Sequence, residues 1–129
     1  MRLKRMLSGK LHRIRVTEAQ VGYVGSVGID ENFMEAAGIE INQEVHIVNL
    51  DNGARWITYA IPAERGSKTM ALNGGGARLG VVGDKLVVMV YDWTDEPTKP
   101  QVVFFGNNNE IVDRGTTEPH GKISPDLEE

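Results

Sequence analysis

Residues 38–47, GIEINQEVHI, recur in outline as residues 80–88, GVVGDKLVV. Each copy begins at a glycine that follows a short helix or turn, and a tight turn then leads into a strand rich in β-branched residues. Two such units favour a small closed barrel with an approximate two-fold axis, because closure leaves no strand edge exposed. The repeat therefore predicts a mainly β fold, a small β-barrel with short helices.

Hydrophobic patterning places further elements around this repeat. An Asn52-Gly53 pair between two apolar runs predicts a hairpin. Asp30 is suited to cap a helix over residues 31–37, which Gly38 can end. The expected strands cover residues 12–17, 44–50, 55–61, 68–73, 85–93 and 101–105.

The composition narrows the class of protein. At 129 residues the chain is long enough for one domain, which we expect over residues 1–113, with a polar, mobile tail over residues 114–129. No apolar run is long enough to span a membrane, and the basic start lacks the apolar stretch of a secretory signal. The absence of cysteine excludes disulfides and thiolate metal sites and fits a cytoplasmic location. The histidines lack the spacing of metal ligands.

Charge is distributed unevenly along the chain. The formal net charge is -4, which argues against general nucleic-acid binding. Residues 1–25 carry a net charge of +5 and residues 26–129 carry -9. Attraction between these segments would hold them together if the chain were cut between them, and the same cations would attract an anionic substrate.

The pair Gly25-Ser26 has a chemical meaning in addition to its structural one. Glycine does not shield its own carbonyl group, so the hydroxyl of a following serine can attack the carbonyl carbon. The attack converts the peptide bond into an ester and allows the chain to break. The alternative is an ordinary turn, in which glycine and serine are both common.

Several groups of residues around this pair decide between the two interpretations. They are Lys10-Leu11-His12-Arg13, Tyr23-Val24-Gly25-Ser26 with Ile29-Asp30, Asn52-Gly53-Ala54-Arg55, Thr58-Tyr59, Glu64-Arg65-Gly66-Ser67, Asn73-Gly74-Gly75-Gly76-Ala77 and Gly83-Asp84. Each group is a weak signal alone, but their order and spacing over residues 1–112 resemble the pyruvoyl-dependent aspartate 1-decarboxylase family. The resemblance implies a closed, six-stranded double-psi β-barrel and a homotetramer with sites between neighbouring subunits. It also implies conversion of L-aspartate to β-alanine and carbon dioxide, which supplies pantothenate and coenzyme A biosynthesis.

The resemblance implies a cofactor made from the chain itself. Cleavage between Gly25 and Ser26 would leave residues 1–25 and residues 26–129, and elimination and hydrolysis would turn Ser26 into a pyruvoyl group with release of ammonia. A substrate amine can condense with the pyruvoyl ketone to a Schiff base, which accepts electrons as carbon dioxide leaves. Neither a metal nor pyridoxal phosphate is then expected. Whether an accessory factor promotes this maturation stays open.

Four further residues receive roles in substrate binding and catalysis from the resemblance. Arg55 and Lys10, which alone fit solvated surface positions, become contacts for the two carboxylates of aspartate, in an order that stays open. Tyr59 becomes the proton donor, although alone it also fits a barrel tyrosine. Thr58 becomes a contact at the cleavage site and for the substrate. On a regular strand Thr58 faces away from Arg55 and Tyr59, so a bulge, a bend or an adjacent subunit must bring them together.

The run Asn73, Gly74, Gly75 and Gly76 offers an amide side chain and unshielded backbone N–H groups. A flexible loop and a phosphate cradle are the alternatives, and the missing Lys-Ser/Thr of a P-loop and the lack of a clear following helix argue against the phosphate cradle. The resemblance makes these residues substrate contacts, although the family commonly has alanine where Gly75 and Gly76 stand. His12, in the opening motif, receives a supporting role.

Two other functions remain open at this stage. An unprocessed barrel could bind a peptide or a small ligand without chemistry, since fold does not fix function. Alternatively, simple hydrolysis of the ester would leave an N-terminal serine that acts as a hydrolase nucleophile. The intact masses of the protein distinguish all three functions.

Overall fold

The computed structural model describes residues 1–118, which form nine strands, one α-helix and one 3-10 helix. The helices are α1 (Glu31–Ala37) and the 3-10 helix η1 (Gly74–Arg78). The strands are β1 (Lys4–Arg15), β2 (Glu18–Gln20), β3 (Val27–Asp30), β4 (Glu44–Asn49), β5 (Arg55–Ala63), β6 (Met70–Asn73), β7 (Lys85–Thr94), β8 (Gln101–Phe105) and β9 (Ile111–Gly115). The predicted mainly β fold is confirmed.

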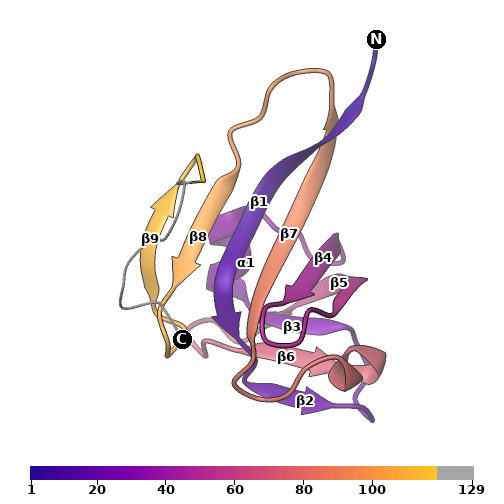
Figure 1. Ribbon diagram of the computed structural model, residues 1–129, viewed down its shortest axis with the longest axis vertical. Helices are drawn as coiled ribbons and strands as arrows, with labels where there is room; N and C mark the ends of the chain where they lie inside the picture. Colours follow the sequence, from indigo (N-terminus) through magenta and orange to yellow (C-terminus); the bar gives the residue numbers. More distant parts are fainter. Residues whose placement is uncertain (119–129) are drawn as a thin grey trace.

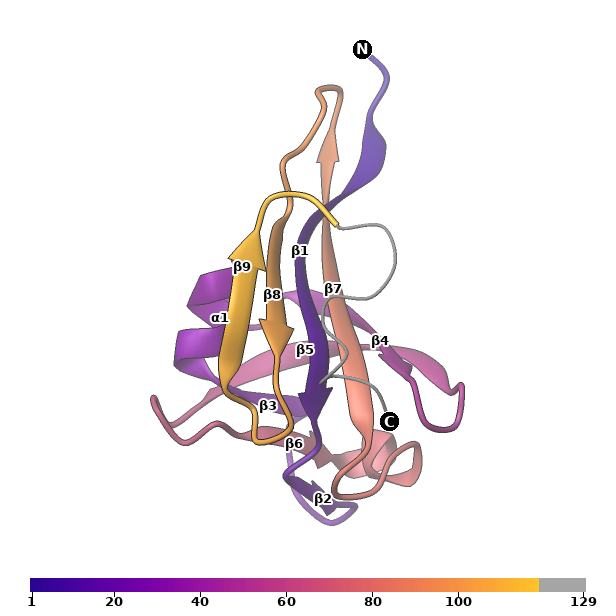
Figure 2. The ribbon, with the colours of Figure 1, turned by 60° about the vertical axis from the view of Figure 1, so that its left-hand side comes forward.

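The strands form one mixed sheet in the order β2-β6-β3-β5-β4-β7-β1-β8-β9. In Figure 1, β1 and β7 run side by side along the long axis, and β2, β3 and β6 cross the lower end of the molecule. Helix α1 contacts β1 and β8 and lies behind these strands in Figure 1, and Figure 2 shows the same part of the molecule after a rotation of 60°. Within residues 1–118, the pairings end at β2 and β9 without joining them. The closed, six-stranded double-psi barrel therefore stays a prediction.

The two sequence repeats form matching turns. The backbone N–H of Gln43 donates to the carbonyl of Glu40 at 3.1 Å, and that of Asp84 donates to Val81 at 3.0 Å. The third residue of each turn is left-handed, with φ values of 71° and 96°. The first turn leads into β4 and the second into β7, and these strands pair with each other in antiparallel orientation. The internal repeat is thus present in the structure as two copies of one turn-and-strand unit.

Helix α1 has the predicted bounds and caps. The Asp30 carboxylate accepts the backbone N–H of the second helical residue at 2.8 Å, and Gly38 ends the helix in the left-handed conformation. Buried Asp30 also accepts the backbone N–H groups of Gly66 and Lys68, at 3.2 and 2.8 Å. One carboxylate therefore fixes the start of the helix to the loop that precedes β6. Among the described residues, no helix is long and apolar enough to cross a membrane.

Some element bounds differ from the sequence prediction. Strand β6 begins at Met70 instead of position 68, because Lys68 has a left-handed φ of 60° that a strand does not accommodate. Strand β9 was not expected, since all its residues are exposed and show no alternation. It extends to Gly115 and so includes the first residues of the predicted tail. Residues 119–129 of that tail lie outside the described part of the chain.

The hydrophobic core lies between the inner face of the sheet and α1. Its fully buried large side chains include Leu11, Ile14, Ile29, Met34, Ile47, Met70, Leu72, Leu86 and Phe105. Trp56 and Ala77 are partly buried and pack against this core. The core thus reaches from the long strands to η1, which is the part of the fold that borders Gly25.

Candidate active site

The Gly25-Ser26 peptide lies in a turn immediately before β3. Gly25 has a φ of 100°, in the left-handed region that favours glycine. A Cβ atom added to Gly25 would lie 2.7 Å from Cδ1 of Ile61. A larger residue at this position would therefore be both strained and crowded, and the carbonyl group would lose its open approach.

Ser26 lies between two strands that carry predicted site residues. The backbone N–H of Tyr59 donates to the Ser26 hydroxyl at 3.4 Å, and the N–H of Asn73 donates to the Ser26 carbonyl at 2.9 Å. A Cβ atom on Gly74 would lie 3.7 Å from the Gly25 carbonyl oxygen. The structure therefore brings together Gly25, Ser26, Asn73 and Gly74 with the backbone of Tyr59.

Strand β5 presents the remaining residues of its motif on two faces. Arg55 and Tyr59 are exposed, while Trp56 and Thr58 are partly buried on the opposite side. The pairing of β4 with β5 runs from Arg55 to Tyr59 without a register shift. The bulge considered as a way to bring Thr58 to the face of Arg55 and Tyr59 is therefore absent from this stretch, and that alternative is wrong.

Along the sheet, Lys10 and His12 lie apart from the strand that contacts Ser26. Both lie on β1, and β4 and β7 separate β1 from β5 in the sheet. Three strand spacings correspond to roughly 14 Å. The Lys10 ammonium group instead contacts the Glu118 carboxylate, with Nζ 2.8 Å from Oε2.

His12 occupies a half-buried position of unusual electrostatics. Its ring meets Phe104 edge-on, with 5.6 Å between ring centroids. Its Nδ1 atom is buried without a hydrogen-bond partner among residues 1–118. Burial, helped by the positive charges of Lys10 and Arg13, lowers the pKa of His12 to about 4. The His12 imidazole is therefore uncharged at pH 7.

We expect His12 to make the fold less stable in weak acid. The His12 pKa is lowered from 6.5 to about 4, so the unfolded chain binds a proton between these pH values that the folded chain does not. The free energy of unfolding should then decrease as the pH falls from 6.5 toward 4 and stay independent of this group above 6.5. Urea unfolding of the wild type and of His12→Asn across this range tests the effect. The variant should lose less stability than the wild type, and equal slopes would contradict the assignment.

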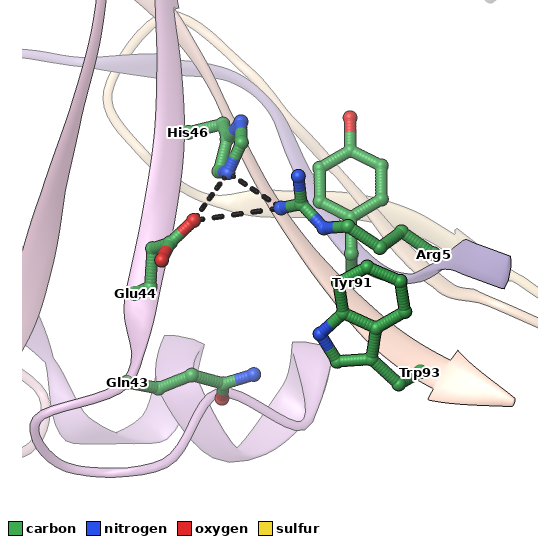
Figure 3. Close-up of a pocket in the computed structure, with 6 residues that line it drawn as sticks. All are labelled: Arg5, Gln43, Glu44, His46, Tyr91 and Trp93. Carbon is green, nitrogen blue, oxygen red and sulfur yellow. Dashed lines mark hydrogen bonds and ion pairs between the residues drawn. The ribbon is translucent and has the colours of Figure 1, made fainter. Parts of the chain in front are cut away.

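A second polar cluster lies beside β5, and the sequence assigned it no role. His46 Nε2 is 2.7 Å from Glu44 Oε2 and 3.0 Å from Nη2 of Arg5, and Glu44 is the cross-strand partner of Tyr59. Figure 3 shows the residues that line the adjoining cavity of about 360 Å³, which are Arg5, Gln43, Glu44, His46, Tyr91 and Trp93. Residues 1–118 contain no group of three or more His, Asp or Glu side chains placed to hold a metal ion.

Comparison with known proteins gives the family. The model of the aspartate decarboxylase family matches residues 1–112. The chain belongs to this family. It is 50% identical over 121 residues to the aspartate 1-decarboxylase of Caldicellulosiruptor saccharolyticus, which covers 91% of this chain and 94% of that protein. The corresponding protein of Carboxydothermus hydrogenoformans is 46% identical, over 91% of this chain and 95% of its own length. That of Bacillus licheniformis is 48% identical, over 88% and 93%. The family resemblance in the motifs is confirmed.

Proposed function

We propose that the chain cuts itself between Gly25 and Ser26 and then converts L-aspartate to β-alanine and carbon dioxide. Its family makes it an aspartate-decarboxylating lyase. The observation that carries the cleavage proposal is the conformation at Gly25. Gly25 has a φ of 100°, and its lack of a side chain removes one obstacle to attack on its carbonyl group by the hydroxyl of the next residue.

In the proposed cleavage the Ser26 hydroxyl is the attacking group and the Gly25 carbonyl is its target. The Ser26 hydroxyl oxygen adds to the Gly25 carbonyl carbon, and the C–N bond breaks as the ester forms. Elimination then releases the Gly25 carboxylate, and water replaces the nitrogen of residue 26, which leaves as ammonia. Asn73, whose N–H binds the Ser26 carbonyl in the uncut chain, is placed to hold the same carbonyl of a pyruvoyl group. Such a group supplies a ketone that binds the substrate amine and accepts electrons as carbon dioxide leaves.

The substrate contacts are proposed from the family motifs. Arg55 is exposed on the same face of β5 as Tyr59, where its guanidinium is free to meet a carboxylate. Tyr59 gives a proton to the substrate carbon that has lost carbon dioxide. The remaining proposed contacts are Lys10, Thr58, Asn73, Gly74, Gly75 and Gly76, with His12 in a supporting role.

The direct test of the function combines mass and turnover. Intact mass spectrometry of the purified protein should give residues 1–25 and a fragment of residues 26–129 whose first residue is pyruvoyl. The cut protein should release carbon dioxide from L-aspartate. One uncut mass without turnover would favour a binding module, and an N-terminal serine would favour a hydrolase.

We expect Arg55→Ala to raise the KM for L-aspartate while self-cleavage continues. Losing one charge-assisted contact costs about 1.5–3 kcal/mol, which corresponds to a KM increase of roughly 10- to 100-fold. Steady-state kinetics and intact mass on one preparation measure both effects. Arg114→Ala, which removes an exposed arginine from β9, is the matched control and should keep the wild-type KM. Turnover of another amino acid in preference to L-aspartate would show that the substrate is wrong.

We propose a homotetramer in which Lys10 and His12 of one subunit approach Ser26 of a neighbour. Their separation from Ser26 within one chain supports this, and so does the exposed apolar surface beside the cleavage site. Val24 is 96% exposed and Ile57 is 62% exposed. Light scattering of the cut protein should give the mass of four chains. A fully active monomer would contradict shared sites.

The proposal extends to the closure of the barrel, the metabolic role of the product and the location of the enzyme. A closed double-psi barrel would place the two turn-and-strand units around a two-fold axis. β-Alanine production would supply pantothenate and coenzyme A biosynthesis, in the cytoplasm. The single domain over residues 1–113 and the mobile tail after it stay predictions from the sequence.

A further inference from the structure

The glycine turn η1 separates the Gly25 carbonyl group from the indole ring of Trp56. At its start, a Cβ atom on Gly74 would lie 3.7 Å from the Gly25 carbonyl oxygen. Two residues later, a Cβ atom on Gly76 would lie 3.2 Å from Nε1 of Trp56 and 3.9 Å from its Cε2. The turn η1 thus lies close to the Gly25 carbonyl group at one glycine and close to the Trp56 indole at another.

Trp56, and not the backbone, restricts the space for a side chain at Gly76. The φ of Gly76 lies outside the left-handed region, so its backbone accepts an alanine. Among residues 1–118, the nearby obstacle is the indole, since carbon and nitrogen atoms normally pack at about 3.5–4.0 Å. At Gly75 an added Cβ atom would meet nothing within 4 Å. Trp56 and Gly76 are thus complementary in size, whereas Trp56 and Gly75 are not.

The polar atom of Trp56 does not account for the position of the ring. Its Nε1 is buried and has no hydrogen-bond partner among residues 1–118. A buried donor without a partner lowers stability, and such groups in native structures call for an explanation. The contacts of the ring with the core and with Gly76 are the ones that remain.

We propose that Trp56 is a positioning residue for self-cleavage, an inference that rests on the proposed function. By packing against Gly76, the indole fixes η1 and so keeps Gly74 against the Gly25 carbonyl group. Attack by the Ser26 hydroxyl requires a closely defined geometry at this carbonyl, and small displacements of supporting groups slow such reactions strongly. A turn that is free to shift would loosen one wall of the cleavage site.

The first test is Trp56→Phe. This variant keeps an aromatic ring but lacks the indole nitrogen side that lies nearest to Gly76. We expect the cleavage half-time, followed by intact mass on freshly purified precursor, to lengthen about 10-fold. The melting temperature should change little, because the variant also removes the unpaired donor. A purely structural role would instead lower the melting temperature and leave the cleavage rate of the folded protein unchanged.

The second test is rescue. Gly76→Ala alone should slow cleavage about 10-fold, because its methyl group pushes the turn away from the indole. In the double variant the methyl group occupies the space that Trp56→Phe vacates, so cleavage should return to within about threefold of wild type. Gly75→Ala is the matched control for an added methyl group. When it is combined with Trp56→Phe, the two reductions in cleavage rate should multiply, and no rescue is expected.

The outcomes separate this inference from the proposed function. A wild-type chain that never cuts itself would overturn the proposed function and this inference with it. A wild-type chain that cuts itself, together with Trp56→Phe at the same rate, would overturn the positioning role alone. The positioning role would also be overturned if the double variant were slowed by the product of the two single-variant reductions in cleavage rate. This comparison holds even if one single variant folds poorly.

Discussion

Ser26→Ala is expected to leave the protein as one uncut chain that releases no carbon dioxide from L-aspartate. The substitution removes the only oxygen placed to attack the Gly25 carbonyl group from the following residue. It leaves the backbone bonds of residue 26 in place, because the carbonyl group still accepts the Asn73 N–H. Denaturing electrophoresis and intact mass should show a single species at all times. Normal cleavage in this variant would falsify the mechanism.

The chain provides a matched control for this experiment at Gly66-Ser67. Gly66 is also left-handed, with a φ of 82°, and a serine also follows it. The Ser67 hydroxyl, however, donates to the backbone carbonyl of Glu64. We therefore expect cleavage at Gly25-Ser26 and none at Gly66-Ser67, where the hydroxyl already has a backbone partner. Ser67→Ala should cut itself at the wild-type rate.

Helix ends and tight turns could be predicted from the sequence, because their conformation depends on residues that are neighbours in the chain. The Asp30 cap and the Gly38 stop define α1 at the predicted residues. The hairpin at Asn52-Gly53 forms between β4 and β5, as the pair predicts. The internal repeat appears as two equivalent turns before β4 and β7. In each case the conformation depends on side chains within a few positions of one another.

Features that depend on distant contacts could not be predicted from the sequence. Trp56 and Gly76 lie on separate elements, so only the folded chain shows that they meet. The separation of Lys10 from Ser26 follows from the strand order, which the periodicity of single strands does not encode. Alternation from Arg55 to Tyr59 follows the regular strand expected from the sequence, and it places Thr58 opposite Arg55. A bend or an adjacent subunit is then the remaining way to bring Thr58 into one pocket with Arg55 and Tyr59.

Tyr59→Phe is expected to separate self-cleavage from decarboxylation. The contact of Tyr59 with the Ser26 hydroxyl runs through its backbone N–H, which phenylalanine keeps. The side chain is 43% exposed, so loss of its hydroxyl group should not leave a buried partner unpaired. Cleavage should therefore proceed to the same two fragments as in the wild type.

Decarboxylation by Tyr59→Phe should be slow, because the phenol is the proposed source of the proton that replaces carbon dioxide. Removing a general acid typically lowers kcat by about 10²–10⁴-fold. Both steps are measured on one preparation, by intact mass and by β-alanine formation at saturating L-aspartate. Tyr91→Phe is the matched control, since the hydroxyl group of that tyrosine contacts Met89 on its own strand. If Tyr59→Phe kept the wild-type kcat, the proton would have to come from another group, and the exposed phenol would have no part in the chemistry.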